Sequence, residues 1–150
     1  MKDYLKAKST GVTEVVPIDD YLVAPVLTDK VTTITEATTL DADDSDKVFV
    51  LSAAAGAAVT LPSPVSGVKY KFIVGSAFAT TDWTIVADDD VIEGGAIVNS
   101  TFVPAANENT ISFVDSAETI GDYVEIISDG TSWFVNGVGA GAGSITFTAP

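Results

Sequence analysis

Short runs of apolar residues, separated by turn-forming residues, recur along most of this chain. The clearest is "VKYKFIV" (68–74), in which Tyr70, Phe72 and Val74 fall on one side of an extended backbone. Lys69 and Lys71 fall on the other side, and this period of two predicts a half-buried strand with its lysines in water. Runs rich in Val, Ile, Thr and aromatic residues predict strands at 31–35, 47–51, 58–61, 68–74, 83–86, 96–99, 110–115, 123–128, 131–136 and 144–148.

The spacing of these runs predicts the fold class. No window shows sustained helical periodicity, and the short strands favour an all-β domain over residues 31–150, an antiparallel β-sandwich or jelly-roll-like arrangement. The alanine-rich stretch 51–62 is interrupted by Gly56, so we expect a loop there, with a single helical turn as the alternative. Residues 137–150 predict a C-terminal strand on a flexible Gly/Ala tether, which pairs in its own sheet or with a neighbouring subunit.

The first 30 residues differ from the rest of the chain. They contain isolated apolar pairs and two prolines, Pro17 and Pro25, which predicts an extended N-terminal arm over residues 1–30. One interpretation is a disordered leader. The other, which the apolar content favours, is a segment that lies against its own domain or a neighbour. Its apolar residues are Val15, Val16, Ile18, Tyr21, Leu22, Val23, Val26 and Leu27.

The segment "GDYVEIISDGTSWFVNG" (121–137) predicts a β-hairpin. An Asp-Gly pair between two alternating runs is the preferred two-residue turn, because both central positions need positive φ. With Asp129 and Gly130 as that turn, Ile126 lies opposite Trp133. Opposed residues share a face, so the prediction is an apolar core face made of Val124, Ile126, Trp133 and Val135.

The other side of this hairpin carries a mixed set of side chains. Phe134 lies there together with Tyr123, Glu125, Ile127, Ser132 and Asn136. A surface that mixes apolar and polar side chains in this way predicts a subunit contact or a shallow binding surface. A three-residue loop would shift the register and swap the faces of one strand, so the alternative faces stay open at this point.

Charge and composition exclude several classes of function. The 150 residues include 21 acidic residues and seven lysines, the net charge is −14, and no positive side chain follows Lys71. Nucleic-acid binding is not expected, because it depends on Lys and Arg displacing counterions from phosphates. The chain has no Cys and no His, the commonest metal ligand and proton carrier. No segment has the roughly 20 apolar residues of a membrane helix or the apolar stretch of a signal peptide, so we expect no membrane partner.

Two acidic clusters are the densest chemical signal. The first, "DADDSD" (41–46), resembles a calcium loop, but its sixth position is Asp46 rather than Gly and its twelfth is Ser52 rather than Glu. A solvated turn, in which Asp side chains accept from nearby backbone amides, is the favoured interpretation. The second, "ADDDVIEGG" (87–95), is interpreted in the same way, with a cation that bridges subunits as its alternative. We therefore expect no metal.

Signatures of catalysis are missing from the sequence. Nucleophile-elbow, phosphate-loop and dinucleotide-binding motifs are absent. A glycosidase needs two carboxylates at a fixed separation, and nothing in a chain this rich in Asp singles out such a pair. We therefore expect neither an enzyme nor a cofactor, with a carboxylate-based hydrolase as a weak alternative.

The blocks quoted above carry a resemblance to a known family. The succession from "TTLDADDSDKVFVLSAAAGAAVTLPSPVSGVKYKFIVG" through "VIEGGAIVN" to "ENTISFVDSAETIGDYVEIISDGTSWFVNGVGAGAGSITFT" resembles small head decoration or cement proteins of marine tailed phages, including cyanophages. The resemblance covers residues 31–148, and its first block also occurs in phage tail and fibre proteins. It implies a β-sandwich or jelly-roll homotrimer on the capsid surface of a virion, made in the host cytoplasm, with no catalytic residues.

Specific contact residues follow from the resemblance and the arm together. The partners expected are the major capsid protein and other copies of the chain. Shell contacts are expected from Val15, Val16, Ile18, Tyr21, Leu22, Val23 and Leu27, and oligomer contacts from Tyr123, Phe134, Ile145 and Phe147. The alternative function is a tail-associated or surface host-recognition module that binds carbohydrate through exposed Trp83, Phe102 and Phe134.

Overall fold

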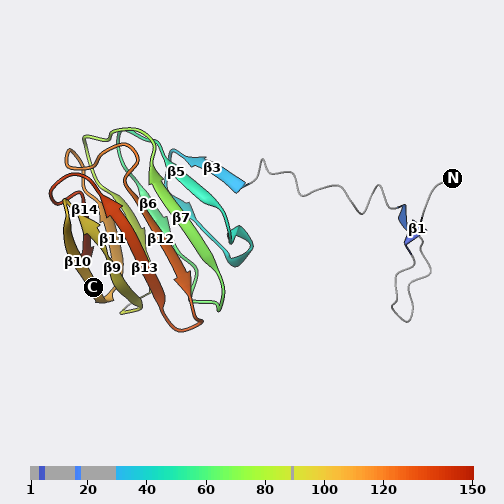
Figure 1. Ribbon diagram of the computed structural model, residues 1–150. Coiled ribbons are helices and arrows are strands. Elements are labelled where there is room, and N and C mark those ends of the chain that lie inside the picture. The colour runs from blue at the N-terminus through green and yellow to red at the C-terminus, as the bar shows by residue number, and fades with distance from the viewer. Residues whose placement is uncertain (1–3, 6–15, 18–29, 89) are drawn as a thin grey trace.

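Two β-sheets lie face to face in the folded part of the chain (Figure 1). The structure is a computed structural model that describes residues 4–5, 16–17, 30–88 and 90–150. Strands make up 49% of the described domain, and the described residues contain no α-helix. The prediction of an all-β sandwich is therefore confirmed, whereas the more specific jelly-roll form is not.

The larger sheet has seven strands and the smaller sheet has five. In spatial order the larger sheet contains β10 (Thr101–Glu108), β9 (Ile92–Val98), β13 (Trp133–Gly139), β12 (Tyr123–Ser128), β7 (Lys69–Val74), β5 (Val48–Leu51) and β3 (Val31–Ile34). The smaller contains β14 (Ile145–Thr148), β11 (Thr110–Phe113), β8 (Trp83–Val86), β6 (Ala58–Thr60) and β4 (Thr38–Thr39). Outside them lie the two-residue pair β1 (Tyr4–Leu5) and β2 (Val16–Pro17) and the short 3-10 helix η2 (Ala42–Asp44).

The sheets are mixed, which corrects the expected antiparallel pairing. From β3 to β9 successive strands alternate between the two sheets, so β5 lies next to β3 and β7 next to β5. A chain that crosses to the other sheet and back returns in its original direction, and these neighbours are therefore parallel. The same alternation makes β4, β6 and β8 parallel. The hairpin strands β12 and β13 pair in the antiparallel sense that we expected, and so do strands distant in sequence, such as β7 with β12 and β8 with β11.

The core lies between the sheets and is built around aromatic rings. On β7, Tyr70, Phe72 and Val74 are buried and Lys69 and Lys71 point outward, which confirms the alternation predicted for this strand. Tyr70 packs against Trp133 with ring centroids 5.6 Å apart. Phe49, Trp83 and Phe113, from strands of both sheets, and Phe78, from the loop between β7 and β8, fill the same layer. Their burial is the main stabilising contribution, at about 25 cal/mol per Å² of apolar surface.

The strand β10 and the first half of β9 were not predicted from the sequence. Pro104 lies inside β10, and Pro has no backbone N–H for a sheet ladder, so this stretch did not resemble a strand. The structure accommodates Pro104 because β10 is the edge strand of its sheet. In β9, Gly95 has a φ of +152° and a Cβ there would lie 2.7 Å from the Phe102 ring. Phe102 thus covers a position where only glycine fits.

The C-terminal segment is not on a flexible tether. Gly137 and Gly139 belong to β13, and a tight turn at 140–144 leads directly into β14. The buried Asp122 carboxylate holds this turn, since it accepts from the backbone N–H groups of Ala140 and Thr119, each at 2.9 Å. β14 then pairs with β11 of the same chain, the first of the two pairings that we considered. Residues 52–57 form the loop expected within the alanine-rich stretch.

Candidate functional site

The β12–β13 hairpin has a longer loop than its Asp-Gly pair suggested. Ser128 lies opposite Trp133 and Ile126 opposite Val135, so the loop contains the four residues 129–132. The Asp129 carboxylate accepts from the N–H groups of Thr131 and Ser132, at 2.8 and 2.9 Å. These hydrogen bonds, first from Ser132 and then from Thr131, hold the pKa of Asp129 below its usual value.

The faces of this hairpin are nevertheless the ones predicted. The observed register differs from the expected one by two residues, and an even shift leaves every side chain on its original side. Trp133 is fully buried, with Val124, Ile126 and Val135 beside it in the core. Phe134 points outward and is 44% exposed, and Tyr123 is half-buried on the same side.

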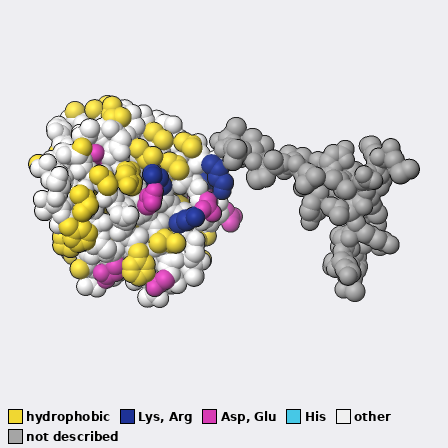
Figure 2. Space-filling model, in the orientation of Figure 1, with side chains coloured by type: hydrophobic (Ala, Val, Ile, Leu, Met, Phe, Trp, Pro, Cys, Tyr) yellow, Lys and Arg dark blue, Asp and Glu magenta, His cyan; other side chains and the backbone are white. Residues whose placement is uncertain are grey.

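Apolar side chains gather on the outward side of the larger sheet, here called the seven-stranded face. Figure 2 shows them spread across this side, with lysines between them. Eight large hydrophobic residues are exposed in the described part of the chain. Six of them lie on strands of this face, namely Val31, Ile97, Phe102, Ile127, Phe134 and Val138. A cluster of exposed apolar side chains of this kind is a candidate contact site.

Cross-strand pairing aligns part of this set into one line, here called the apolar row. The register places Phe102 opposite Ile97, Ile97 beside Val138, and Val138 opposite Tyr123. It continues from Tyr123 to Ile73 on β7 and Val50 on β5. The row therefore crosses six strands of one sheet without a charged side chain.

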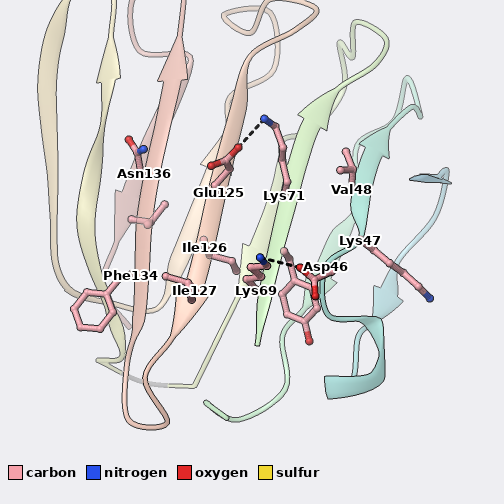
Figure 3. A pocket seen from close by; sticks show the side chains of 12 residues that line it. Asp46, Lys47, Val48, Lys69, Lys71, Glu125, Ile126, Ile127, Phe134 and Asn136 are labelled. Atoms are coloured by element: carbon pink, nitrogen blue, oxygen red, sulfur yellow. Dashed lines mark hydrogen bonds and ion pairs between the residues drawn. The ribbon is translucent and has the colours of Figure 1, made fainter. Parts of the chain in front are cut away.

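A small polar cluster lies beside the apolar row (Figure 3). The Lys71 ammonium is 2.7 Å from the Glu125 carboxylate and 4.3 Å from the centre of the Tyr123 ring. Lys69 forms a second ion pair with Asp46 at 2.9 Å, and this contact lowers the pKa of Asp46 and raises that of Lys69. Each lysine is thus matched with an acid from a neighbouring element. The cation over the Tyr123 ring also restrains a residue that we expected to contact another subunit.

The surface next to these pairs is hollowed into a shallow groove of about 560 Å³. Phe134, Ile127 and Val48 give it an apolar lining, and Asn136 adds an amide. Small-molecule sites normally enclose most of their ligand in a deep cleft. An open groove on a sheet instead suits a broad partner that covers the whole face.

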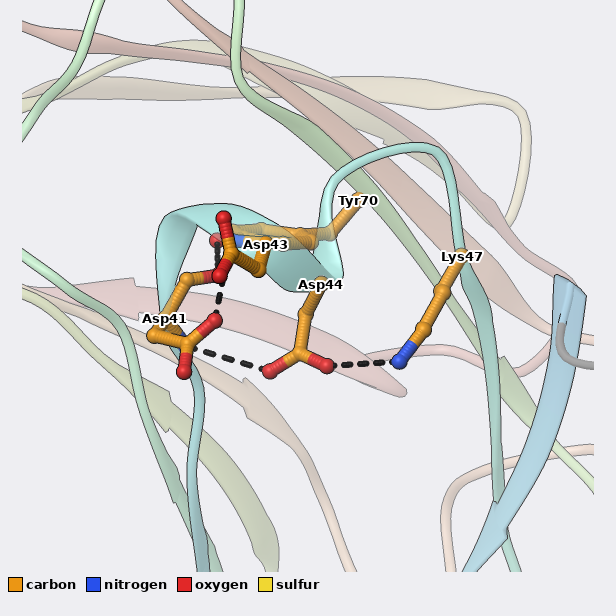
Figure 4. A network of polar contacts seen from close by, with 5 residues as sticks. All are labelled: Asp41, Asp43, Asp44, Lys47 and Tyr70. Atoms are coloured by element: carbon orange, nitrogen blue, oxygen red, sulfur yellow. Dashed lines mark hydrogen bonds and ion pairs between the residues drawn. The ribbon is translucent and has the colours of Figure 1, made fainter. Parts of the chain in front are cut away.

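The first acidic cluster forms the local structure that we favoured over a calcium loop (Figure 4). The Asp41 carboxylate accepts from the Asp43 N–H at 2.9 Å, and Asp44 accepts in return from the Asp41 N–H at 3.1 Å. This reciprocal capping opens η2. Partial burial acts to raise the pKa of Asp44, but hydrogen bonds from Lys47 and the Asp41 amide lower it on balance.

Tyr70 anchors this acidic loop to the sheet. Its hydroxyl donates to the Asp41 carbonyl at 2.5 Å. Burial, and then the charges of Asp44 and Asp41, raise the pKa of Tyr70 to about 12, so it remains a neutral donor at ordinary pH. In the second cluster, Asp88 accepts from the Ser63 hydroxyl. Among the residues that the structure describes, no three side chains of the ligating types are grouped to hold a metal ion.

Three aromatic or aliphatic predictions need correction. Ile145 is 1% exposed and pairs with buried Phe113, so it belongs to the core and not to an oligomer contact. Phe147 points to the same interior side and packs against the core, because side chains along β14 alternate. Trp83 is fully buried and donates to the Ala53 carbonyl, which removes it from any exposed sugar platform.

The predicted shell-contact residues of the arm are mostly beyond what the structure describes. Val16 lies in β2, which pairs with β1. Val15, Ile18, Tyr21, Leu22, Val23 and Leu27 lie outside the described residues. Their contact with a capsid therefore stays a prediction.

Most of the apolar row was not predicted from the sequence. Ile97, Ile73 and Val50 each looked like an ordinary strand residue, because their alignment depends on which strands are neighbours. Phe102 could not be placed while β10 was unrecognised. A local signal did exist, since Phe102 follows an Asn99-Ser100 turn, and both residues of that turn have positive φ.

Comparisons with known proteins identified no relative of this chain. No family model matches the chain, no curated protein matches it, and no solved structure matches it. Within the described ranges no helix is both long and apolar enough to cross a membrane. The seven-stranded face is accordingly the feature on which a function can be argued.

Proposed function

We propose that this chain is a virion structural protein that decorates a phage capsid and acts by contact, without catalysis. The observation that carries the proposal is the seven-stranded face, where six exposed large hydrophobic side chains share one side of a sheet. Monomeric domains rarely leave such a surface uncovered unless a partner binds there. The resemblance of residues 31–148 to cement proteins supports the same interpretation.

The proposed partners are the major capsid protein and other copies of the chain. The arm, with apolar residues between Val15 and Leu27, provides the shell contact, and the seven-stranded face provides the contact between copies. The proposed location is the outside of the capsid, after synthesis in the host cytoplasm. The excess of negative charge keeps separate copies soluble before they assemble.

Binding to purified phage heads tests the proposal. The full chain should bind heads from which it has been removed, at fixed positions visible by electron cryomicroscopy. A chain that lacks residues 1–28 should no longer bind, while its circular dichroism still shows a folded β domain. Unchanged occupancy by the shortened chain would refute the arm's role, and a position in the tail would refute decoration of the head.

Carbohydrate recognition is a second candidate, favoured by one observation. Phe102 and Phe134 are both exposed on the seven-stranded face, 57% and 44%, and Phe134 borders a groove with Asn136 and Glu125. Aromatic faces with nearby amide and carboxylate groups suit stacking and hydrogen bonding to a sugar. Binding of the full chain to a glycan array, lost in Phe134→Ala, would support it. Measurable hydrolysis of a polysaccharide would contradict both candidates.

A further inference from the structure

We infer that the seven-stranded face is covered by a second copy of the same chain, face to face, in a two-fold dimer. The inference rests on the proposed function only in treating this face as a contact surface. Three properties of the face argue for a second copy: its apolar row, its small net charge and its extent.

The apolar row provides the attractive part of the contact. Phe102, Ile97 and Val138 are between 43% and 57% exposed and form the β10 end of an uninterrupted line across the sheet. Two such sheets can stack about 10 Å apart, with the side chains of one face between those of the other. Burial of both rows removes from water the largest group of exposed apolar side chains in the described domain.

The net charge of this face is small, although the domain as a whole is strongly acidic. Residues 31–150 contain three lysines and 16 acidic residues, a net charge of −13. The face carries two lysines, Lys69 and Lys71, against three acids, Glu93 and Glu125 on its strands and Asp46 beside Lys69. Two copies that meet through this face therefore avoid most of the repulsion between their acidic loops, and of the two outward faces it is the one that also offers large apolar side chains.

The face is large enough for a specific contact. Seven strands about 4.8 Å apart span about 29 Å, and three outward rows extend about 20 Å along the strands. The resulting area is about 600 Å² on each copy, or about 1,200 Å² in total, the lower limit for stable specific interfaces.

The arrangement of apolar residues favours a dimer over a ring. A two-fold contact uses the same patch on both copies, whereas a three-fold ring needs two different patches on each chain. Among the described residues, the exposed large hydrophobics outside this face are Val65 and Ile120, and each lies in a loop. A single broad patch therefore favours two-fold pairing, and the trimer implied by the sequence resemblance is the main rival.

Sedimentation equilibrium of the purified full chain, from 1 to 100 µM, tests the inference. We expect a concentration-dependent dimer of twice the 15.4 kDa chain mass. Val138→Lys, in the apolar row, should raise the dimer dissociation constant at least tenfold. The matched control Thr60→Lys adds the same charge to an exposed strand position of the smaller sheet and should change it less than twofold.

Three results would overturn the inference: a monomer throughout this range, a trimer, or a dimer that Val138→Lys leaves intact. If Val138→Lys does not fold by circular dichroism, Ile97→Thr, which keeps the β-branched shape, replaces it with the same expected direction. Salt provides an independent measurement. Raising sodium chloride from 50 to 500 mM should tighten the dimer because it screens the repulsion between copies, and a weaker dimer would contradict an apolar contact.

These experiments separate the dimer from the proposed function. They use the purified chain alone, so a monomer would refute the two-fold contact and leave capsid binding to be measured on heads. Conversely, a dimer that never binds a head would support the contact and refute decoration.

Discussion

The two outward faces of the sandwich follow the same alternation but carry different side chains. The seven-stranded face presents large apolar groups, of which Val31 and Phe102 are the most exposed. The outward side of the smaller sheet, here called the five-stranded face, presents small hydroxyl and methyl groups. Its two cross-strand rows are Thr146, Ser112, Thr84 and Ala58, and Thr148, Thr110, Val86, Thr60 and Thr39.

The inward side chains of both sheets stabilise the fold, whereas the large outward side chains of the seven-stranded face contribute little to it. Both faces keep β-branched residues, which suit an extended backbone, and both sheets bury their inward rows in one core. Threonine hydroxyls hydrogen-bond to water, so the five-stranded face needs no partner. The bulk of Phe134 or Ile97 adds little to the fold of a single chain, because these side chains remain partly in water. The proposed contact between copies would account for their size.

The largest expected effect contrasts the two sides of one strand. Trp133→Ala should lower the free energy of unfolding by about 3–5 kcal/mol, because it leaves a cavity beside Tyr70. The neighbouring Phe134→Ala should change it by less than about 1 kcal/mol, since Phe134 points to solvent. Urea unfolding followed by circular dichroism measures both values. Equal losses would show that Phe134 also belongs to the core.

Substitutions that make one face more polar, or the other more apolar, should change the hydrophobicity of the surface without unfolding the chain. Ile97→Thr with Val138→Thr should give the seven-stranded face the character of the five-stranded one and reduce retention on a hydrophobic column. Thr60→Val with Thr148→Val should increase it. Each pair should alter the free energy of unfolding by less than about 1 kcal/mol, because the exchanged positions are at the surface. If neither double substitution changes the retention time, the two faces do not differ in exposed apolar surface.

The ion pair beside the apolar row should contribute less. A double-mutant cycle with Lys71→Ala and Glu125→Ala should give a coupling energy of about 0.2–1 kcal/mol in urea unfolding, since both side chains reach solvent. The coupling should shrink in 0.5 M sodium chloride. The equivalent cycle for Lys47 and Asp44, away from the apolar row, is the matched comparison. A coupling unaffected by salt would indicate a pair that is screened from water.

The smallest expected effect concerns the hairpin loop that presents Phe134. Asp129→Ala should lower the melting temperature slightly at pH 7, because two backbone N–H groups lose their acceptor. The folded pKa of Asp129 is lowered, so its contribution is present above the ordinary value of 3.8 and is lost as pH falls through the folded pKa. The melting temperatures of the two proteins should therefore converge as the pH falls below 3.8. A constant gap would assign the effect to backbone conformation instead.

Much of the fold was predictable because strand alternation is a local property. Strands such as 83–86 and 123–128 were found at their observed bounds, and the inward side of "VKYKFIV" was right. The hairpin loop was two residues too short in the prediction, because Asp-Gly is also compatible with a four-residue loop closed by Asp129. Trp133 and Phe134 were still assigned to the right sides, since the error was even.

The remaining features depend on pairing between distant segments. The turn at 140–144 was mistaken for a tether because its order comes from Asp122, eighteen residues before Ala140. Ile145 was expected at an oligomer contact because the sequence does not show that β14 pairs with β11. Likewise, the parallel neighbours β3, β5 and β7 result from crossing between sheets, for which no local motif exists.

The sequence by itself determined that this is an all-β chain, and it assigned the inward and outward sides of strands such as 68–74 and 123–128, because both follow from the two-residue period of an extended backbone. Only the tertiary structure decided that Phe102, Ile97, Val138, Tyr123, Ile73 and Val50 form one row. These residues come from strands between 48 and 139, and hydrogen bonding between those strands sets their alignment. The surface proposed to act by contact is therefore recognisable only from the paired sheets.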